Sequence, residues 1–169
     1  MYDQGVTVID ERVDPLALER QVCFALAITN RAVLAIYRPL LEPLGLTHPQ
    51  YLVMLALWDH HRSDRTGRAL SVKEIASLLQ LDSATLSPML KRLEALGLIT
   101  RTRSASDERA TDVELTKAGL QLRRKALKIP PAVVDRLGVG LDELEHLHAV
   151  LTRINGAALA AGALEGDRS

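Results

Sequence analysis

The sequence contains very little cysteine and few aromatic residues. It has one cysteine, one tryptophan, one phenylalanine and three tyrosines among 169 residues. A single cysteine excludes a disulfide within the chain and any metal site built from several cysteines. Because aromatic rings are scarce, we expect a core of leucine, alanine, valine and isoleucine, which suits a protein of packed helices.

Long apolar runs are also missing. No uninterrupted segment approaches the roughly 18 apolar residues of a membrane-spanning helix. The first 14 residues, MYDQGVTVIDERVD, are polar and acidic rather than signal-like. We therefore expect a cytoplasmic protein without a membrane partner.

The chain carries no net charge, with 21 basic and 21 acidic residues. That balance alone argues against a nucleic-acid partner. However, residues 62–128 hold 14 Lys and Arg against 8 Asp and Glu, which leaves 7 against 13 for the remainder. A basic middle between acidic ends fits a DNA-reading lobe on a dimerisation scaffold, although random clustering would give the same counts.

Residues 81–115 have the pattern of a helix followed by a β-hairpin. The helix is predicted to begin at Asp82 or Ser83 and to end at Gly97, with apolar residues at helical spacing between them. LITRTR and TDVEL are the predicted strands, joined by the polar turn SASDER. A short helix is predicted for SVKEIASLLQ, where Ser71 and Glu74 have capping-box spacing. The fold class is therefore mainly α with a small β-wing, a winged helix-turn-helix.

In a winged helix-turn-helix, the second helix enters a DNA major groove and the hairpin tip reaches the minor groove. The predicted DNA-binding residues are Ser83, Thr85, Ser87, Lys91, Arg92, Arg101, Arg103 and Arg109. Arg109, at the hairpin tip, is the expected minor-groove reader, and Arg101 and Arg103 are expected to neutralise phosphates. Asp107 is expected to brace the wing. Alternatively, Ser83, Thr85 and Ser87 do not contact DNA and are only the residues that commonly begin a helix.

The chain is expected to have four segments: a loose arm (1–14), an N-terminal dimerisation helix and turn (15–46), the winged helix-turn-helix region (47–128), and C-terminal dimerisation helices with a tail (129–169). The first helix is predicted to start at Pro15 after a capping Asp14, and Pro39 and Pro43 are predicted to break it. Apolar residues recur at helical spacing in the first and last helices: Leu18, Val22, Ala25, Leu26, Thr29, Val33 and Ile36, then Leu144, Leu147, Leu151, Ile154 and Ala158. One neighbour cannot cover these stripes, so we expect them to pack against a second subunit.

Several motifs together give a family resemblance. They are QVCFAL, YRPLLEPLGLTHPQYLVMLALW, DSATLSPMLKRLEALGLITR, RSASDERATDVELTKAG and KALKIP, within residues 20–131. With these motifs the chain resembles MarR-family winged-helix repressors, and among them the one-cysteine organic-hydroperoxide sensors called OhrR. The resemblance implies a homodimer without a cofactor that binds an inverted repeat in double-stranded DNA. An organic hydroperoxide would release the DNA by oxidising the cysteine.

The resemblance also assigns the sensing residues. Cys23 would be the sensing thiol, and Tyr37 the phenol that hydrogen-bonds its thiolate. His48 stands where the family has a second tyrosine: an imidazolium would favour the thiolate more than a phenol does, whereas a neutral or averted ring would leave the cysteine less reactive. Tyr51 either lines this pocket or packs in the core. Without a second cysteine, a sulfenic acid on Cys23 must be capped by a low-molecular-weight thiol or a backbone nitrogen.

Two other functions compete with the redox sensor. In one, Cys23 is an inert core residue and a small phenolic or other aromatic ligand releases the repressor. In the other, the chain is a thiol peroxidase that uses Cys23, but no peroxidase motif or resolving cysteine is present. His60, His61, His146 and His148 have no carboxylate or cysteine at fitting spacing, so no metal is expected.

Overall fold

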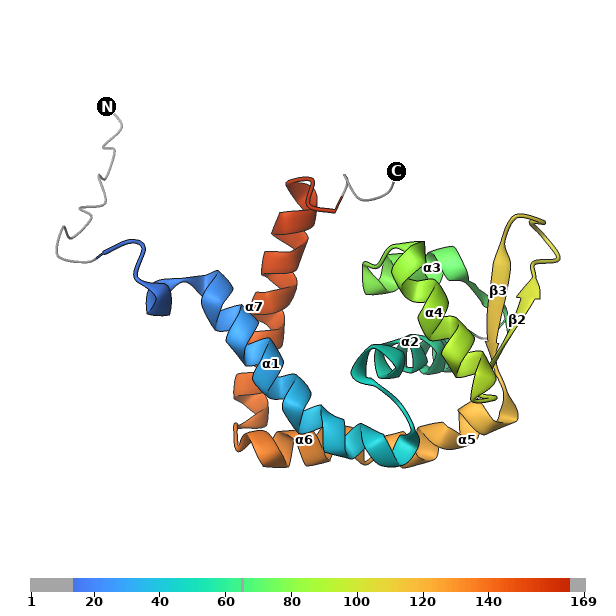
Figure 1. Cartoon of the computed structure of the whole chain (residues 1–169), viewed down its shortest axis with the longest axis horizontal. Coiled ribbons are helices and arrows are strands. Elements are labelled where there is room, and N and C mark those ends of the chain that lie inside the picture. Colours follow the sequence, from blue (N-terminus) through green and yellow to red (C-terminus); the bar gives the residue numbers. More distant parts are fainter. Residues whose placement is uncertain (1–13, 65, 165–169) are drawn as a thin grey trace. The chain divides into compact units, whose positions relative to one another are not determined.

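The computed structural model describes residues 14–64 and 66–164, and this part of the chain is mainly helical (Figure 1). The chain divides into two compact units, Met1–Ala35 and Ile36–Ser169. Of the arm expected at residues 1–14, only Asp14 lies within the described residues, and the tail from residue 165 onward lies outside them.

The first unit contains a turn and most of helix α1 (Val22–Leu41). The prediction that this helix starts at Pro15 was wrong. The Asp14 carboxylate accepts a hydrogen bond from the Leu16 N–H at 2.9 Å, so it caps a turn rather than a helix. A short 3-10 helix, η1 (Leu18–Arg20), follows, and the extended backbone of Gln21 separates it from α1.

Helix α1 continues past Pro39, which was predicted to break it, and ends at Leu41. Proline cannot donate to the carbonyl four residues earlier, but Pro39 lies two residues before the end of α1, so the missing bond weakens only the last turn. A second 3-10 helix, η2 (Glu42–Leu44), then stops at Gly45, whose left-handed φ of 69° makes the expected turn.

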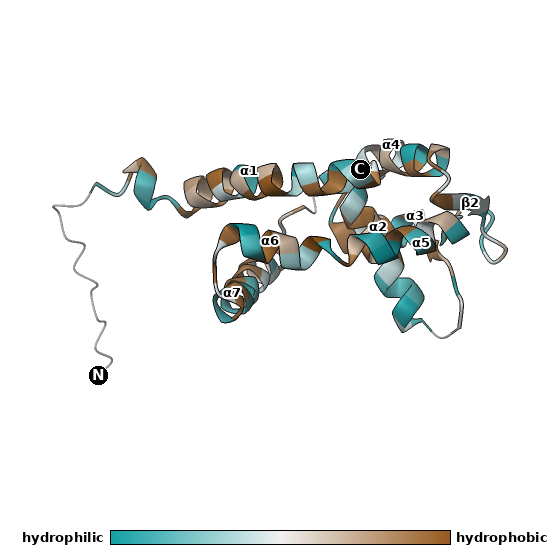
Figure 2. Cartoon of the chain, turned by 90° about the horizontal axis from the view of Figure 1, so that it is seen from below, coloured by the Kyte–Doolittle hydropathy of each residue, from teal (hydrophilic) through white to brown (hydrophobic). Residues whose placement is uncertain are grey.

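Most apolar side chains of α1 are exposed, and the helix is largely apolar along its length (Figure 2). Val22 is 65% exposed, Leu26 42% and Ile28 41%, and Leu41 is the buried residue of the helix. Val22–Leu44 has a mean hydropathy of 1.2, enough by length and composition alone to cross a membrane. This segment has no uninterrupted apolar run of that length, as expected, but it passes a test of average hydropathy because an average tolerates interspersed polar residues. A helix buried in a protein interface has the same composition, so this is weak support for a membrane span.

The second unit contains the winged helix-turn-helix. Its elements are α2 (His48–Ser63), β1 (Leu70–Ser71), α3 (Val72–Leu79), α4 (Ser83–Ala95), β2 (Ile99–Arg103) and β3 (Thr111–Leu115). The strands form an antiparallel sheet in the order β1-β3-β2, with Ile99 opposite Leu115 and Leu70 opposite Val113. Strand β1 was not predicted, because two residues carry no periodicity and it exists only through its pairing with β3.

Side-chain caps fix the starts of these helices. The capping boxes of α2, from Thr47 and Gln50, and of α3, from Ser71 and Glu74, both form as predicted. Asp82 caps α4, and the Thr116 hydroxyl caps the next helix, α5 (Lys117–Ala126). Helix α4 ends at Ala95, two residues before Gly97, which has a left-handed φ of 70°.

The core is aliphatic, as expected. Its most deeply buried side chains come from α2, α3, α4 and the sheet, and include Met54, Ile75, Leu86, Leu90 and Ile99. Helix α6 (Ile129–Leu137) has the proline pair 130–131 in its first turn, and α7 (Leu141–Ala160) follows it. Helix α7 buries none of its residues in the single chain. The apolar stripe predicted on this helix is therefore uncovered.

Candidate functional site

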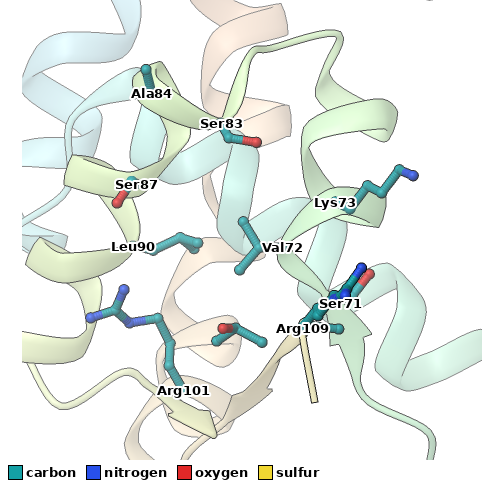
Figure 3. Close-up of a pocket in the computed structure, with 11 residues that line it drawn as sticks. Ser71, Val72, Lys73, Ser83, Ala84, Ser87, Leu90, Arg101 and Arg109 are labelled. Carbon is teal, nitrogen blue, oxygen red and sulfur yellow. The ribbon is translucent and has the colours of Figure 1, made fainter. Parts of the chain in front are cut away.

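A hollow of about 570 Å³ lies between α3, α4 and the wing formed by β2 and β3 (Figure 3). Hydroxyl groups of α4 line one side of it, and cationic side chains come from the wing and from α3. The residues that line it are Ser71, Val72, Lys73, Ser83, Ala84, Ser87, Leu90, Arg101, Arg109, Ala110 and Thr111. Hydroxyl and cationic groups are those that proteins commonly use to contact the nucleic-acid backbone.

The predicted DNA-binding residues of α4 divide into two groups. Ser83 and Ser87 line the hollow, whereas Lys91 and Arg92 are exposed farther along the helix. Thr85 is already engaged: its hydroxyl donates to Asp82 Oδ2 at 2.9 Å, and its N–H donates to Asp82 Oδ1 at 2.6 Å. These two bonds lower the pKa of Asp82 below its usual range. The Thr85 hydroxyl therefore serves the helix cap, which is the alternative role considered for it.

Arg101 is bound to Glu94 at the C-terminal end of α4. Its Nη2 and Nε lie 2.6 and 3.0 Å from Glu94 Oε2, and its N–H donates to Glu94 Oε1 at 3.2 Å. The guanidinium holds the pKa of Glu94 below its usual range. These contacts connect β2 to α4, and the Glu94 carboxylate largely neutralises the charge of Arg101. Sequence analysis did not identify Glu94, because only the tertiary fold brings it to Arg101.

The tip of the wing is held by Asp107. Its carboxylate accepts a hydrogen bond from the Arg109 N–H at 2.9 Å, and its carbonyl accepts one from the Ala110 N–H at 2.9 Å. These bonds close the turn and leave the Arg109 side chain exposed at the hollow. Arg103 is exposed at the end of β2 and does not line the hollow.

Three rings assigned to the sensing pocket gather in the second unit. The ring centroids of Tyr37 and His48 are 5.0 Å apart in an edge-on arrangement, and Tyr51 lies 6.0 Å from Tyr37 and 6.5 Å from His48. Tyr51 is only 3% exposed and also packs edge-on against Trp58, so it belongs to the core as well as to this cluster. Tyr37 and His48 are partly exposed.

Burial sets the protonation of the cluster. It raises the pKa values of Tyr37 and Tyr51 and lowers the pKa of His48. At neutral pH the two phenols keep their protons, and His48 is a neutral imidazole. Each of these rings can therefore donate a hydrogen bond, but none of them supplies a positive charge.

Cys23 lies in the first unit as the second residue of α1, and its thiol is free and exposed. Exposure leaves the sulfur accessible to an oxidant. Sequence analysis also did not identify Lys73 as a residue of the hollow, although it is a cation in the first turn of α3.

Comparisons with known proteins identify the family. Residues 35–125 match the family described as transcriptional regulator SarA/Rot. The organic hydroperoxide resistance transcriptional regulator of Bacillus subtilis is 41% identical over 85% of this chain and 92% of its own length. The HTH-type transcriptional regulator TtmR of Methylorubrum extorquens is 46% identical over 78% of this chain and 64% of its own length.

Solved structures of DNA-bound proteins are also similar to this chain in fold and sequence. The structure of reduced AbfR bound to DNA has a TM-score of 0.66 and 30% identity, covering 84% of this chain and 94% of AbfR. A crystal structure of overoxidized AbfR bound to DNA has a TM-score of 0.65 and 31% identity, covering 83% of this chain and 93% of AbfR. The chain therefore belongs to the MarR-family winged-helix transcriptional regulators, in the OhrR group of organic hydroperoxide regulators, and it is a DNA-binding regulator rather than an enzyme.

Proposed function

We propose that the chain is a cytoplasmic, homodimeric repressor that releases an inverted-repeat operator when an organic hydroperoxide oxidises Cys23. The observation that carries the proposal is the exposed thiol of Cys23, the single cysteine of a chain 41% identical to an organic hydroperoxide resistance regulator. Within the single chain the Cys23 side chain is not part of the buried core.

The proposed chemistry needs the thiolate, the peroxide and one proton from the solvent for the departing alkoxide. The sulfur attacks one peroxide oxygen and the O–O bond breaks, so that the sulfur becomes a sulfenic acid and the peroxide is reduced to an alcohol. A low-molecular-weight thiol then displaces water from the sulfenic acid and forms a mixed disulfide. The chain has no second cysteine, so this capping thiol must come from outside it.

The ring cluster fits the role of hydrogen-bond donor to a thiolate. Tyr37 and His48 lie edge to face at 5.0 Å. Both are neutral donors at pH 7, because a tyrosine keeps its proton there in any case and burial lowers the pKa of His48. In the proposal they donate to the Cys23 thiolate of the second subunit. His48 then acts as a neutral imidazole, so its contribution is a hydrogen bond and not a cation.

The dimer explains why two helices expose so much apolar surface. Leu26 and Ile28 of α1, and Leu147 and Ile154 of α7, are each more than 40% exposed in the single chain. Apolar stripes of this length are normally covered in solution. A second copy of the chain would cover them and would place two winged-helix lobes on the two halves of an inverted repeat.

A DNA-release experiment tests the proposal. The reduced protein is bound to DNA from its own promoter and treated with about one equivalent of cumene hydroperoxide and excess free cysteine, with Cys23→Ser in parallel. We expect the wild-type protein to bind and then dissociate, and the variant to stay bound, because serine cannot form a sulfenic acid. The single-equivalent dose matters, since overoxidized AbfR is a DNA-bound species.

Continued binding of the wild-type protein after conversion of its thiol to the mixed disulfide would refute the proposal. It would favour the alternative in which Cys23 is inert and an aromatic ligand releases the DNA. Release of both proteins would show that the peroxide acts on a residue other than Cys23.

A further inference from the structure

Three cations line the hollow beside α4: Lys73, Arg101 and Arg109. They differ in how far other groups of the protein neutralise them. Arg101 is paired with Glu94 through contacts of 2.6 and 3.0 Å, so a phosphate would have to compete with a carboxylate already in place. Arg109 has its backbone fixed by Asp107 and its side chain exposed.

Lys73 is exposed in the first turn of α3, at the rim of the hollow on the side opposite α4, and its side chain extends outward (Figure 3). No ion pair found within residues 14–64 and 66–164 involves Lys73. The carboxylate next to it in sequence, Glu74, is occupied by other groups. It accepts hydrogen bonds from the N–H and the hydroxyl of Ser71 at 2.8 and 2.9 Å.

Arg68 neutralises Glu74 from the loop before β1, with its Nη1 2.9 Å from Glu74 Oε1. The loop is organised to present this arginine: the Arg68 N–H donates to Asp64 Oδ2 at 2.8 Å, and its carbonyl lies 2.6 Å from His60 Nε2. The Ser71 N–H and hydroxyl, together with Arg68, lower the pKa of Glu74. The negative charge beside Lys73 is thus compensated within the protein.

We propose that Lys73 binds a DNA phosphate and is a backbone contact of the winged-helix lobe in addition to the α4 and wing residues. The loop at 64–68 then has an indirect role, because Arg68 compensates Glu74 and leaves the lysine charge available to the DNA. Arg101 acts as a positioning residue that fixes the wing to α4. The inference rests on DNA binding alone, and it is tested with reduced protein, so its failure and a failure of the redox proposal are distinguishable.

The salt dependence of DNA binding tests this contact. Each phosphate neutralised by a protein cation contributes about 0.9 to the slope of log K against log salt concentration. For Lys73→Gln we expect the slope to fall by about 0.9 relative to the wild type. We also expect a similar fold-loss of affinity on a selected operator and on an unrelated duplex, because a phosphate contact carries no sequence information.

Lys128→Gln is the matched control, since it removes the same charge from an exposed residue between α5 and α6, away from the hollow. Its slope should equal that of the wild type, and circular dichroism should show all three proteins equally folded. An unchanged slope for Lys73→Gln would overturn the proposal. A loss confined to the selected operator would also overturn it, because Lys73 would then read a base.

Discussion

Gly119 shows how closely α5 approaches the turn between α4 and β2. A Cβ atom at this position would lie 2.2 Å from the backbone oxygen of Leu98. That oxygen also accepts the Thr116 N–H at 3.0 Å, and the Gly119 carbonyl accepts the buried Trp58 Nε1–H at 2.9 Å. Gly119 therefore lies where helix α2, the wing and α5 meet. A clash between an added Cβ atom and the Leu98 backbone oxygen could not be relieved by rotating a side chain.

We predict that Gly119→Ala destabilises the protein by about 3 kcal/mol, the range of a severe overpacking in a core. Gly156→Ala in α7 is the control, because nothing lies within 4 Å of its Cβ position. In a helix, alanine at that open site should be neutral or stabilising by up to about 1 kcal/mol. Urea unfolding of both variants measures the difference, and equal stabilities would contradict the described approach of α5 to Leu98.

At the scale of elements, the Glu94–Arg101 pair joins helix α4 to the wing. The Glu94 carboxylate accepts three hydrogen bonds from Arg101, and the pair is partly exposed, with the arginine side chain at 24% and the glutamate at 38%. Because Arg101 lowers the pKa of Glu94, the folded state holds this carboxylate ionised more firmly than the unfolded chain does. The stabilisation is therefore present above the usual pKa of a glutamate and is lost as the pH falls through the lowered value.

We predict that Glu94→Gln lowers the thermal midpoint by a few degrees at pH 7, and that its difference from the wild type closes as the pH falls below the usual range of a glutamate. Thermal melts of the two proteins from pH 7 to pH 3 measure the gap. A gap that stays constant over this range would mean that the ion pair contributes nothing to stability.

The elements that could be predicted from the sequence are those whose determinants lie within a few residues of one another. Thr47 with Gln50, and Ser71 with Glu74, are local caps, and both helices begin where these residues place them. Asp14 resembled such a cap, yet its carboxylate closes a turn, because the same side chain can serve either structure. The same limit applies to the cations that line the hollow. The sequence shows that residue 101 is an arginine, but only the fold shows that Arg101 forms an ion pair with Glu94.

At the scale of the whole molecule, the proposed dimer should depend on the apolar face of α7. Leu151 is 38% exposed in the single chain, so arginine there should leave the single chain folded. The same arginine would place an unpaired charge in the subunit interface, which is strongly unfavourable. We predict that sedimentation equilibrium gives twice the chain mass of 18.5 kDa for the wild type and a monomer for Leu151→Arg.

Leu78→Arg is the control for this substitution, because Leu78 is 61% exposed on α3 and lies outside the proposed interface. This variant should stay dimeric. A dimeric Leu151→Arg, or a monomeric wild type, would contradict the proposed role of α7.

The most direct test of the account follows the Cys23 oxidation state and DNA occupancy in the same samples. Reduced protein on fluorescent operator DNA is titrated with cumene hydroperoxide in the presence of free cysteine, with anisotropy recorded and intact mass measured at each point. The account predicts that the released fraction rises with the fraction of Cys23 present as mixed disulfide, and that Cys23→Ser shows neither change. Full conversion of Cys23 to the mixed disulfide with the DNA still bound would contradict it.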